Sequence, residues 1–165
     1  MSEPVAQQPQ PTPAPLRLVT PTGTFIAFGD RLTRKLFRVL DRLGISVLGS
    51  RTLAVRGRKS GEWRTTPVNL LVLNGERYLV APRGHTQWVR NMRVVGGGEL
   101  RLGRKAEPFT AVEVADGEKT PILREYLRKW GWEVGMFFED VTAKSPDSRL
   151  AEIAPGFPVF RIAAQ

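Results

Sequence analysis

A short basic run between residues 57 and 67 contains the residues best suited to bind a ligand. It reads Gly-Arg-Lys-Ser-Gly over residues 57–61 and is followed by Arg64 and Pro67. The two glycines permit unusual backbone angles and a close approach of a ligand, and successive amides in such a turn can form an anion-binding concavity. Lys59 supplies a point charge, and Arg64 supplies a planar fork that suits phosphate or carboxylate. The run therefore favours anion binding, although its spacing alone is also typical of a charged hairpin tip.

The common catalytic motifs are missing from the sequence. Arg58 stands where a phosphate-binding P-loop requires a glycine before its lysine. The three glycines that start at residue 96 end a predicted helix rather than open one, and no serine lies in a G-x-S-x-G pattern. The chain has no cysteine and a single histidine, His85. Thiolate and multi-histidine metal sites are therefore excluded, and we expect no metal.

The net charge of the chain is concentrated in its middle third. The total is +9, from 25 basic and 16 acidic residues. Residues 51–105 contain 12 basic and 3 acidic residues, which is a net charge of +9 for this segment alone, whereas residues 1–50 carry +3 and residues 106–165 carry −3. Such a field favours an anionic partner, which is a nucleic acid, a phosphorylated cofactor or an acidic membrane surface.

Short apolar segments separated by turn residues predict a small antiparallel barrel of about six strands. We expect the strands over residues 52–55, 64–73, 77–81, 99–102, 106–114 and 157–162, with a tight hairpin at residues 74–75. One predicted helix begins after Thr86 and ends at Gly96. A second begins at Thr120 and ends at Gly131. The fold class is therefore mainly β (α+β), with helices flanking the barrel.

The first fifty residues differ in composition from the rest. Residues 1–21 are rich in proline and glutamine, and we expect them to be disordered. Residues 24–43 have the apolar spacing of an amphipathic helix with a basic face, which could pack on the sheet or lie on anionic lipid headgroups. We divide the chain into a tail (1–21), a basic helix with its linker (22–50) and a barrel domain (51–165). The sequence has no signal pattern or bilayer-length apolar run, so we expect a cytoplasmic protein, with peripheral membrane contact through the first helix as an addition.

Three segments of the chain resemble a known family. Residues 57–67, with the sequence GRKSGEWRTTP, resemble the signature of the deazaflavin-dependent nitroreductase family, the Ddn-like reductases that use coenzyme F420. Val-Ala-Pro-Arg-Gly at residues 80–84 and Trp-Val-Arg-Asn-Met at residues 88–92 are further matches. The resemblance covers residues 51–114 and, more loosely, the chain from the first helix to the last strand. It implies a split β-barrel, related to the flavin-binding split barrels, that holds the deazaflavin in a groove.

The resemblance also implies which residues bind the cofactor. Lys59 and Arg64 match the positions that hold the phosphate and the acidic lactyl-oligoglutamate tail of F420. The other implied cofactor-binding residues are Ser60, Pro67, Ala81, Pro82, Arg83, Gly84, Trp88 and Asn91. The positive charge of residues 51–105 fits a multiply charged anion. Flavin mononucleotide is the alternative cofactor, and it would need less charge because it lacks the oligoglutamate tail.

The activity that the resemblance implies is hydride transfer from the reduced deazaflavin to a small hydrophobic acceptor, such as a quinone, an enone or a nitro compound. The substrate-pocket tyrosines of the nitroimidazole-reducing members have no clear counterparts here. Aromatic residues occupy that region instead, and we expect Trp130, Trp132 and Phe137 to line the acceptor pocket. His85, beside the cofactor loop, is a candidate proton donor, although an exposed loop histidine is the simpler interpretation.

Two other functions fit parts of the sequence. A non-catalytic carrier would bind the deazaflavin or a lipid without turnover. A nucleic-acid-binding barrel would use Trp63, Tyr78 and Trp88 as stacking platforms among the arginines. The glycine-flanked run and the helical position of Trp88 favour the cofactor over nucleic acid. Both monomers and dimers fit the resemblance.

Overall fold

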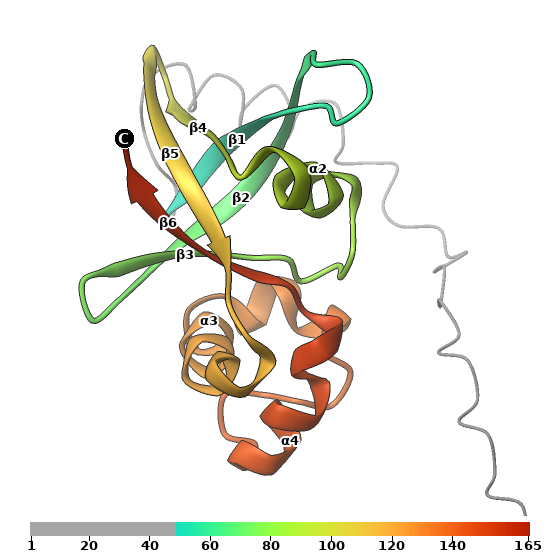
Figure 1. The fold of residues 1–165 in the computed structure, drawn as a ribbon. Coiled ribbons are helices and arrows are strands. Elements are labelled where there is room, and N and C mark those ends of the chain that lie inside the picture. Colours follow the sequence, from blue (N-terminus) through green and yellow to red (C-terminus); the bar gives the residue numbers. More distant parts are fainter. Residues whose placement is uncertain (1–48) are drawn as a thin grey trace, which may run out of the picture.

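Six antiparallel strands close into a barrel in the order β1-β2-β3-β6-β5-β4. The computed structural model describes residues 49–165, and Figure 1 shows the barrel above a layer of helices. The strands are β1 (Ser50–Arg56), β2 (Trp63–Leu73), β3 (Glu76–Val80), β4 (Gly97–Leu102), β5 (Lys105–Glu113) and β6 (Val159–Ala164). The expected antiparallel barrel is confirmed, and β6 completes it by pairing with both β3 and β5.

Strand β2 changes its neighbour halfway along its length. Its residues from Trp63 to Asn69 pair with β1, and those from Leu70 to Leu73 pair with β3. The turn to β3 uses left-handed backbone at Asn74 (φ 52°) and Gly75 (φ 78°), as a two-residue hairpin requires. Pro67 lies in the half that pairs only with β1, so the opposite edge of the strand is open there. A proline is tolerated at such an edge because it has no N–H to contribute to a second ladder.

The first apolar core fills the barrel and is closed by helix α2 (Gln87–Val95). Val89 and Met92 point into this core and are fully buried. The helix ends at Gly96, whose left-handed φ of 70° stops it as predicted. Gly98 does not end the helix and belongs to β4. A Cβ at this position would lie 2.5 Å from the carbonyl oxygen of Ala54, so the close approach of β4 to β1 requires glycine.

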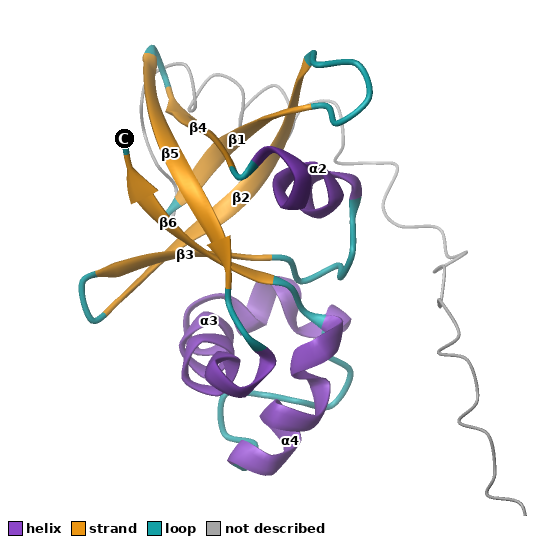
Figure 2. Cartoon of the chain, viewed as in Figure 1, coloured by secondary structure: helices purple, strands orange, loops and turns teal. Residues whose placement is uncertain are grey.

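The second core lies between the barrel and the helical layer, which Figure 2 shows in purple. Helix α3 (Lys119–Val134) packs Leu123 and Trp130 against barrel residues such as Leu71, and α4 (Asp147–Ile153) adds Leu150. Three short 3-10 helices connect this layer: η1 (Asp116–Glu118), η2 (Gly135–Phe137) and η3 (Ala154–Gly156).

Two sequence-based boundaries in this layer are wrong. Helix α3 passes through Gly131 and ends at Val134, because the glycine lies in open space and Val134 continues the buried face of the helix. Strand β6 begins at Val159 rather than at residue 157, because η3 occupies the chain just before it. Helix α4 was not predicted at all. It has seven residues and buries only Leu150, which leaves no periodic signal to detect.

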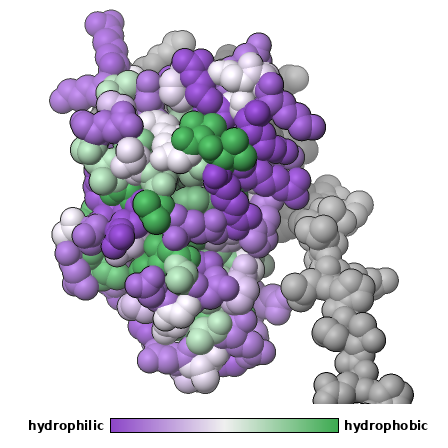
Figure 3. Space-filling model, viewed as in Figure 1, coloured by the Kyte–Doolittle hydropathy of each residue, from purple (hydrophilic) through white to green (hydrophobic). Residues whose placement is uncertain are grey.

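The predicted tail (1–21), the predicted basic helix (24–43) and its membrane contact lie outside the described residues. Within residues 49–165, no helix is long and apolar enough to span a membrane. Figure 3 shows that one face of the molecule is mostly hydrophilic, with small apolar patches between the charged side chains.

Candidate functional site

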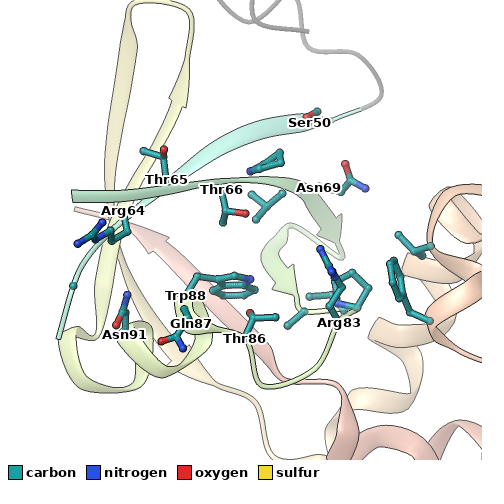
Figure 4. A pocket seen from close by; sticks show the side chains of 18 of the residues that line it. Ser50, Arg64, Thr65, Thr66, Asn69, Arg83, Thr86, Gln87, Trp88 and Asn91 are labelled. Carbon is teal, nitrogen blue, oxygen red and sulfur yellow. The ribbon is translucent and has the colours of Figure 1, made fainter. Parts of the chain in front are cut away.

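A cavity of about 1010 Å³ lies between the open half of β2, helix α2 and the helical layer. In Figure 4, Arg64 and Asn91 mark one end of it, Asn69 and Arg83 mark the other, and Trp88 stands between them. We call these the cationic end and the apolar end. Besides the sequence-predicted residues, the cavity is lined by Ser50, Gly57, Arg58, Thr65, Thr66, Val68, Asn69, Val80, Thr86, Gln87, Tyr126, Glu133 and Val134.

The structure brings together nine of the ten residues that the resemblance assigned to the cofactor. Those in the lining are Lys59, Ser60, Arg64, Pro67, Ala81, Pro82, Arg83, Trp88 and Asn91. Gly84 does not line the cavity. Its left-handed φ of 73° lets its N–H donate to the Ala81 carbonyl (3.0 Å) while its own carbonyl accepts from the Thr86 N–H (2.8 Å). Gly84 thus shapes the loop that carries the other residues.

The basic run forms a tight turn at the cationic end. The Gly57 N–H donates to the Glu62 carbonyl (2.8 Å), and the Gly61 N–H donates to the Gly57 carbonyl (2.7 Å). Lys59 has no ion-pair partner within residues 49–165. Arg64 pairs with Glu62 at 3.2 Å, but both side chains are largely exposed, so this pair is weak and easily exchanged for a ligand. The turn therefore presents cations that a ligand can recruit.

Arg58 is a cationic residue of this end that sequence reasoning did not assign to the cofactor. Its Nη1 donates to Gln87 Oε1 (3.0 Å) and to Asn91 Oδ1 (2.9 Å), and its backbone N–H also donates to Asn91 Oδ1 (3.3 Å). Both partners are neutral amides on α2. Since Arg58 precedes Lys59 in the run, a cation at this position was visible in the sequence, but the contact across 33 residues was not.

The middle of the cavity combines an aromatic wall with an unsatisfied hydroxyl. Trp88 packs at a tilt on Phe160 of the barrel core, with ring centroids 5.7 Å apart. Thr86 occupies the N-cap position of α2, but its side chain makes no capping hydrogen bond. Its Oγ1 is buried and has no hydrogen-bond partner among residues 49–165. A buried hydroxyl without a partner is costly, so this atom is suited to bond a polar group of a ligand.

The apolar end is formed by the helical layer. Phe137 lines the cavity here, and the Arg83 guanidinium lies over its ring at 5.7 Å from the centroid. Tyr126 also lines it and was not predicted. Burial has the largest effect on the pKa of the Tyr126 hydroxyl and raises it. Hydrogen bonding by Asn69 lowers this pKa in part, and the charge of Glu133 raises it further. Asn69 Nδ2 also donates to Glu133 Oε2 at 3.3 Å.

The structure places the other predicted acceptor-pocket residues elsewhere. Trp130 is buried in the second core, where its ring lies 5.0 Å from that of Tyr126. Trp132 is on the opposite side of α3 and is 74% exposed. Neither residue lines the cavity. Residues two apart on a helix point to nearly opposite sides, and the sequence did not reveal which face of α3 packs against the barrel.

His85 also lies outside the cavity lining. Its Nδ1 is 3.1 Å from Nη1 of Arg93, which in turn pairs with Glu113 of β5 at 2.6 Å.

The three aromatic residues considered for nucleic-acid stacking are dispersed. Trp88 lines this cavity and Tyr78 lines a smaller one of about 270 Å³. The guanidinium groups of Arg56 and Arg101 lie over the Trp63 ring, at 4.1 and 5.2 Å from its centroid.

The barrel and its cavity define a split-barrel protein whose cavity is lined by several basic side chains. Residues 36–133 match the F420H(2)-dependent quinone reductase family. Because this match covers more than half of the sequence, the chain belongs to that family. No curated protein matches the sequence.

Solved structures share the fold at low sequence identity. The Agrobacterium tumefaciens protein Atu2129, of unknown function, is 16% identical over 87% of this chain and 58% of its own, with a TM-score of 0.51. This chain therefore spans just over half the length of that protein. A structure described as a domain-swapped dimer is 20% identical over 80% of this chain and 96% of its own, with a TM-score of 0.50. The F420-H2 dependent reductase FDR-A is 20% identical over 70% and 94%, with a TM-score of 0.47.

Proposed function

We propose that this chain is an F420-dependent oxidoreductase that transfers a hydride from the reduced deazaflavin to a small hydrophobic acceptor, with a quinone as the first candidate and enones and nitro compounds as others. The observation that carries the proposal is the polarity of the cavity. Arg58, Lys59 and Arg64 gather at one end, whereas Tyr126 and Phe137 line the other, where Arg83 is the one cation of the lining within residues 49–165. One cavity thus suits both an extended anionic cofactor and an apolar co-substrate.

The residues present fit the deazaflavin cofactor. The cationic end offers two guanidinium groups and an ammonium, which are the donors that phosphate and carboxylate groups prefer. The unpartnered Oγ1 of Thr86 offers a further hydrogen bond to a polar atom in the middle of the cavity. Flavin mononucleotide has a single phosphate and would leave part of this charge unused. The donor set therefore favours F420 over the flavin.

When bound, the reduced deazaflavin supplies a hydride from its ring carbon C5. The chain's own task is to position both reactants and to exclude water. Lys59 and Arg64 would bind the anionic tail, and Trp88 with the open edge of β2 at Pro67 would confine the ring. Phe137 would pack on the acceptor, and the Tyr126 hydroxyl would donate a hydrogen bond to the oxygen that becomes reduced.

A fluorescence titration with oxidised F420 and with flavin mononucleotide tests the cofactor. We expect tight binding of F420 and weak or no binding of the flavin. The Lys59→Ala/Arg64→Ala variant should lose F420 binding. The matched control is Arg104→Ala/Lys105→Ala, which removes the same charge from the β4–β5 turn, outside the cavity lining. Equal loss in both variants would show that net charge, and not the site, binds the cofactor.

Turnover then separates a reductase from a carrier. Reduced F420 is mixed with the protein and a panel of quinones, enones and nitro compounds, and its oxidation is followed by absorbance. Acceptor-dependent oxidation supports the reductase. Tight binding without oxidation by any member of the panel would contradict it and would favour the non-catalytic carrier.

A further inference from the structure

Asn91 is the buried polar residue that joins the basic turn to helix α2. It is 5% exposed, and its Oδ1 accepts two hydrogen bonds from the same residue, one from the backbone N–H of Arg58 (3.3 Å) and one from its Nη1 (2.9 Å). Gln87, one helical turn earlier, accepts from the same Nη1 at 3.0 Å. The two amides thus fix both the backbone and the guanidinium of Arg58.

This contact restrains a cation without neutralising it. Within residues 49–165, the hydrogen-bond partners of the Arg58 guanidinium are amide oxygens, so its full charge remains available at the cavity wall. A free arginine side chain loses considerable rotamer freedom when it binds a ligand. Arg58 has already lost much of that freedom through its hydrogen bonds to Gln87 and Asn91. A restrained and unneutralised guanidinium is the arrangement expected of a preorganised anion-binding group.

Resting on the function proposed above, we infer that Asn91 raises cofactor affinity by holding Arg58 in place rather than by touching the cofactor. Asn91 is in this view a positioning residue, and Arg58 is the group that meets the anion. Gln87 assists from the more exposed side of the same helix face. The alternative is a direct hydrogen bond from Asn91 Nδ2 to the cofactor, because Asn91 also lines the cavity.

A double-mutant cycle on oxidised F420 binding separates these two roles. We expect Asn91→Ala and Arg58→Ala each to weaken F420 binding about tenfold, which is the scale of one hydrogen bond to a charged group. If Asn91 acts through Arg58, the double variant binds no more weakly than Arg58→Ala alone. An undiminished effect of Asn91→Ala in the Arg58→Ala background would overturn the inference, because Asn91 would then not act through the Arg58 guanidinium.

The isosteric variant Asn91→Asp tests whether the charge of Arg58 matters beyond the shape of the turn. Aspartate keeps the oxygen that accepts both hydrogen bonds, so the melting temperature should be maintained. It also neutralises the guanidinium, so F420 binding should weaken about tenfold and become less sensitive to salt. Asn74→Asp is the matched control, since it adds the same charge at the β2–β3 turn, where the positive φ tolerates aspartate. Unchanged affinity in Asn91→Asp would reduce Asn91 to a structural role.

The same experiments distinguish failure of this inference from failure of the proposed function. If the wild-type chain does not bind F420, the proposed function fails and the inference fails with it. If the wild-type chain binds F420 but the two substitutions are additive, the proposed function stands and only the positioning role of Asn91 is overturned.

Discussion

A buried tyrosine, Tyr126, lies at the apolar end of the cavity, opposite Lys59 and Arg64. The side chain of Tyr126 is 2% exposed, and its ring packs against Trp130 in the second core. Burial raises the pKa of its hydroxyl, so the group keeps its proton throughout the neutral and mildly alkaline range. A protonated hydroxyl in this position can donate a hydrogen bond to a reduced acceptor without competing as a base.

We expect Tyr126→Phe to lower kcat for acceptor reduction about a hundredfold, the lower end of what a positioned proton donor contributes. The Kd for oxidised F420 should not change, because the hydroxyl lies at the other end of the cavity. Steady-state kinetics and the fluorescence titration measure the two quantities. Tyr78→Phe, which removes the same hydroxyl outside this cavity, should leave both unchanged. A full kcat in Tyr126→Phe would exclude the role.

Cavity residues such as Tyr126 could not be predicted from the sequence, whereas others could. Local motifs found Lys59, Arg64 and Trp88 because these residues lie within short runs whose chemistry is readable. Tyr126 and Asn69 were missed because they meet only through the packing of α3 on β2, far apart in the chain. Phe137 was predicted and lines the cavity from η2, whereas Trp130 and Trp132 do not line it, because the second core decides which face of α3 is buried.

Two glycines show how the elements constrain their residues in opposite ways. We expect Gly98→Ala to lower the free energy of unfolding by about 1–3 kcal/mol, because its Cβ would meet the Ala54 carbonyl at 2.5 Å and force β4 away from β1. We expect Gly131→Ala to raise it by about 0.4–1 kcal/mol, because a Cβ in the middle of α3 meets no atom of residues 49–165 within 4 Å and reduces the freedom of the unfolded chain. Urea denaturation measures the free energy of unfolding of both variants. A change of the same sign and size in the two would contradict the close contact at Gly98 and the open space at Gly131.

An ion pair joins α2 to strand β5. Arg93 donates two hydrogen bonds to Glu113, from Nε at 2.7 Å and from Nη2 at 2.6 Å, and these hydrogen bonds lower the pKa of Glu113 below its ordinary value of 4.5. A lowered carboxylate pKa in the folded state stabilises the protein above the unfolded-state pKa. That stabilisation is lost as the pH falls through the lower, folded-state pKa.

We therefore expect Glu113→Gln to reduce stability at pH 7 by about 0.5 kcal/mol, a small value because the pair is partly exposed to solvent. The difference from the wild type should shrink as the pH falls below about 4.5 and vanish once the carboxyl is protonated in both states. Urea denaturation across this pH range measures it. A difference that persisted in acid would show that packing, and not the ion pair, holds β5 to α2.

At the scale of the elements, the sequence predicted what local patterns encode. The Asn74–Gly75 hairpin and the end of α2 at Gly96 were correct because each depends on a backbone conformation that few residues adopt. The end of α3 was wrong because Gly131 is tolerated where packing on Leu71 and its neighbours supplies the stability. The seven-residue α4 is held by tertiary contact alone.

At the scale of the whole molecule, the charge distribution predicts how cofactor binding responds to salt. The cavity lining contains the cations Arg58, Lys59, Arg64 and Arg83 against the single carboxylate Glu133. Each exposed charge pair at about 4 Å contributes about 1 kcal/mol in water and is screened by salt. We expect the Kd for F420 to rise about tenfold between about 20 and 500 mM KCl. A Kd independent of salt would show that the charges do not contact the anion.

The net positive charge of residues 51–105 could be counted from the sequence, and it predicted an anionic partner. The sequence could not predict that much of this charge gathers at one end of a cavity, because that depends on how β2, the basic turn at residues 57–61 and α2 pack together. The strand pairs that close the barrel could not be predicted from the sequence either. The pairing of β6 with β3 and β5 joins residues between 47 (Glu113 and Phe160) and 85 (Arg77 and Ile162) positions apart, and no local pattern specifies such a register.

The two apolar cores have a consequence for how such a protein can diversify. The cationic end is built on the barrel core through α2 and β2, whereas Tyr126, Val134 and Phe137 belong to the helical layer and the second core. Substitutions in α3 and η2 can therefore reshape the apolar end, where we propose that the acceptor binds, while the cationic end keeps its geometry. Descendants of one ancestral barrel would inherit a common coenzyme and drift toward different oxidants, with the change recorded in the helical layer.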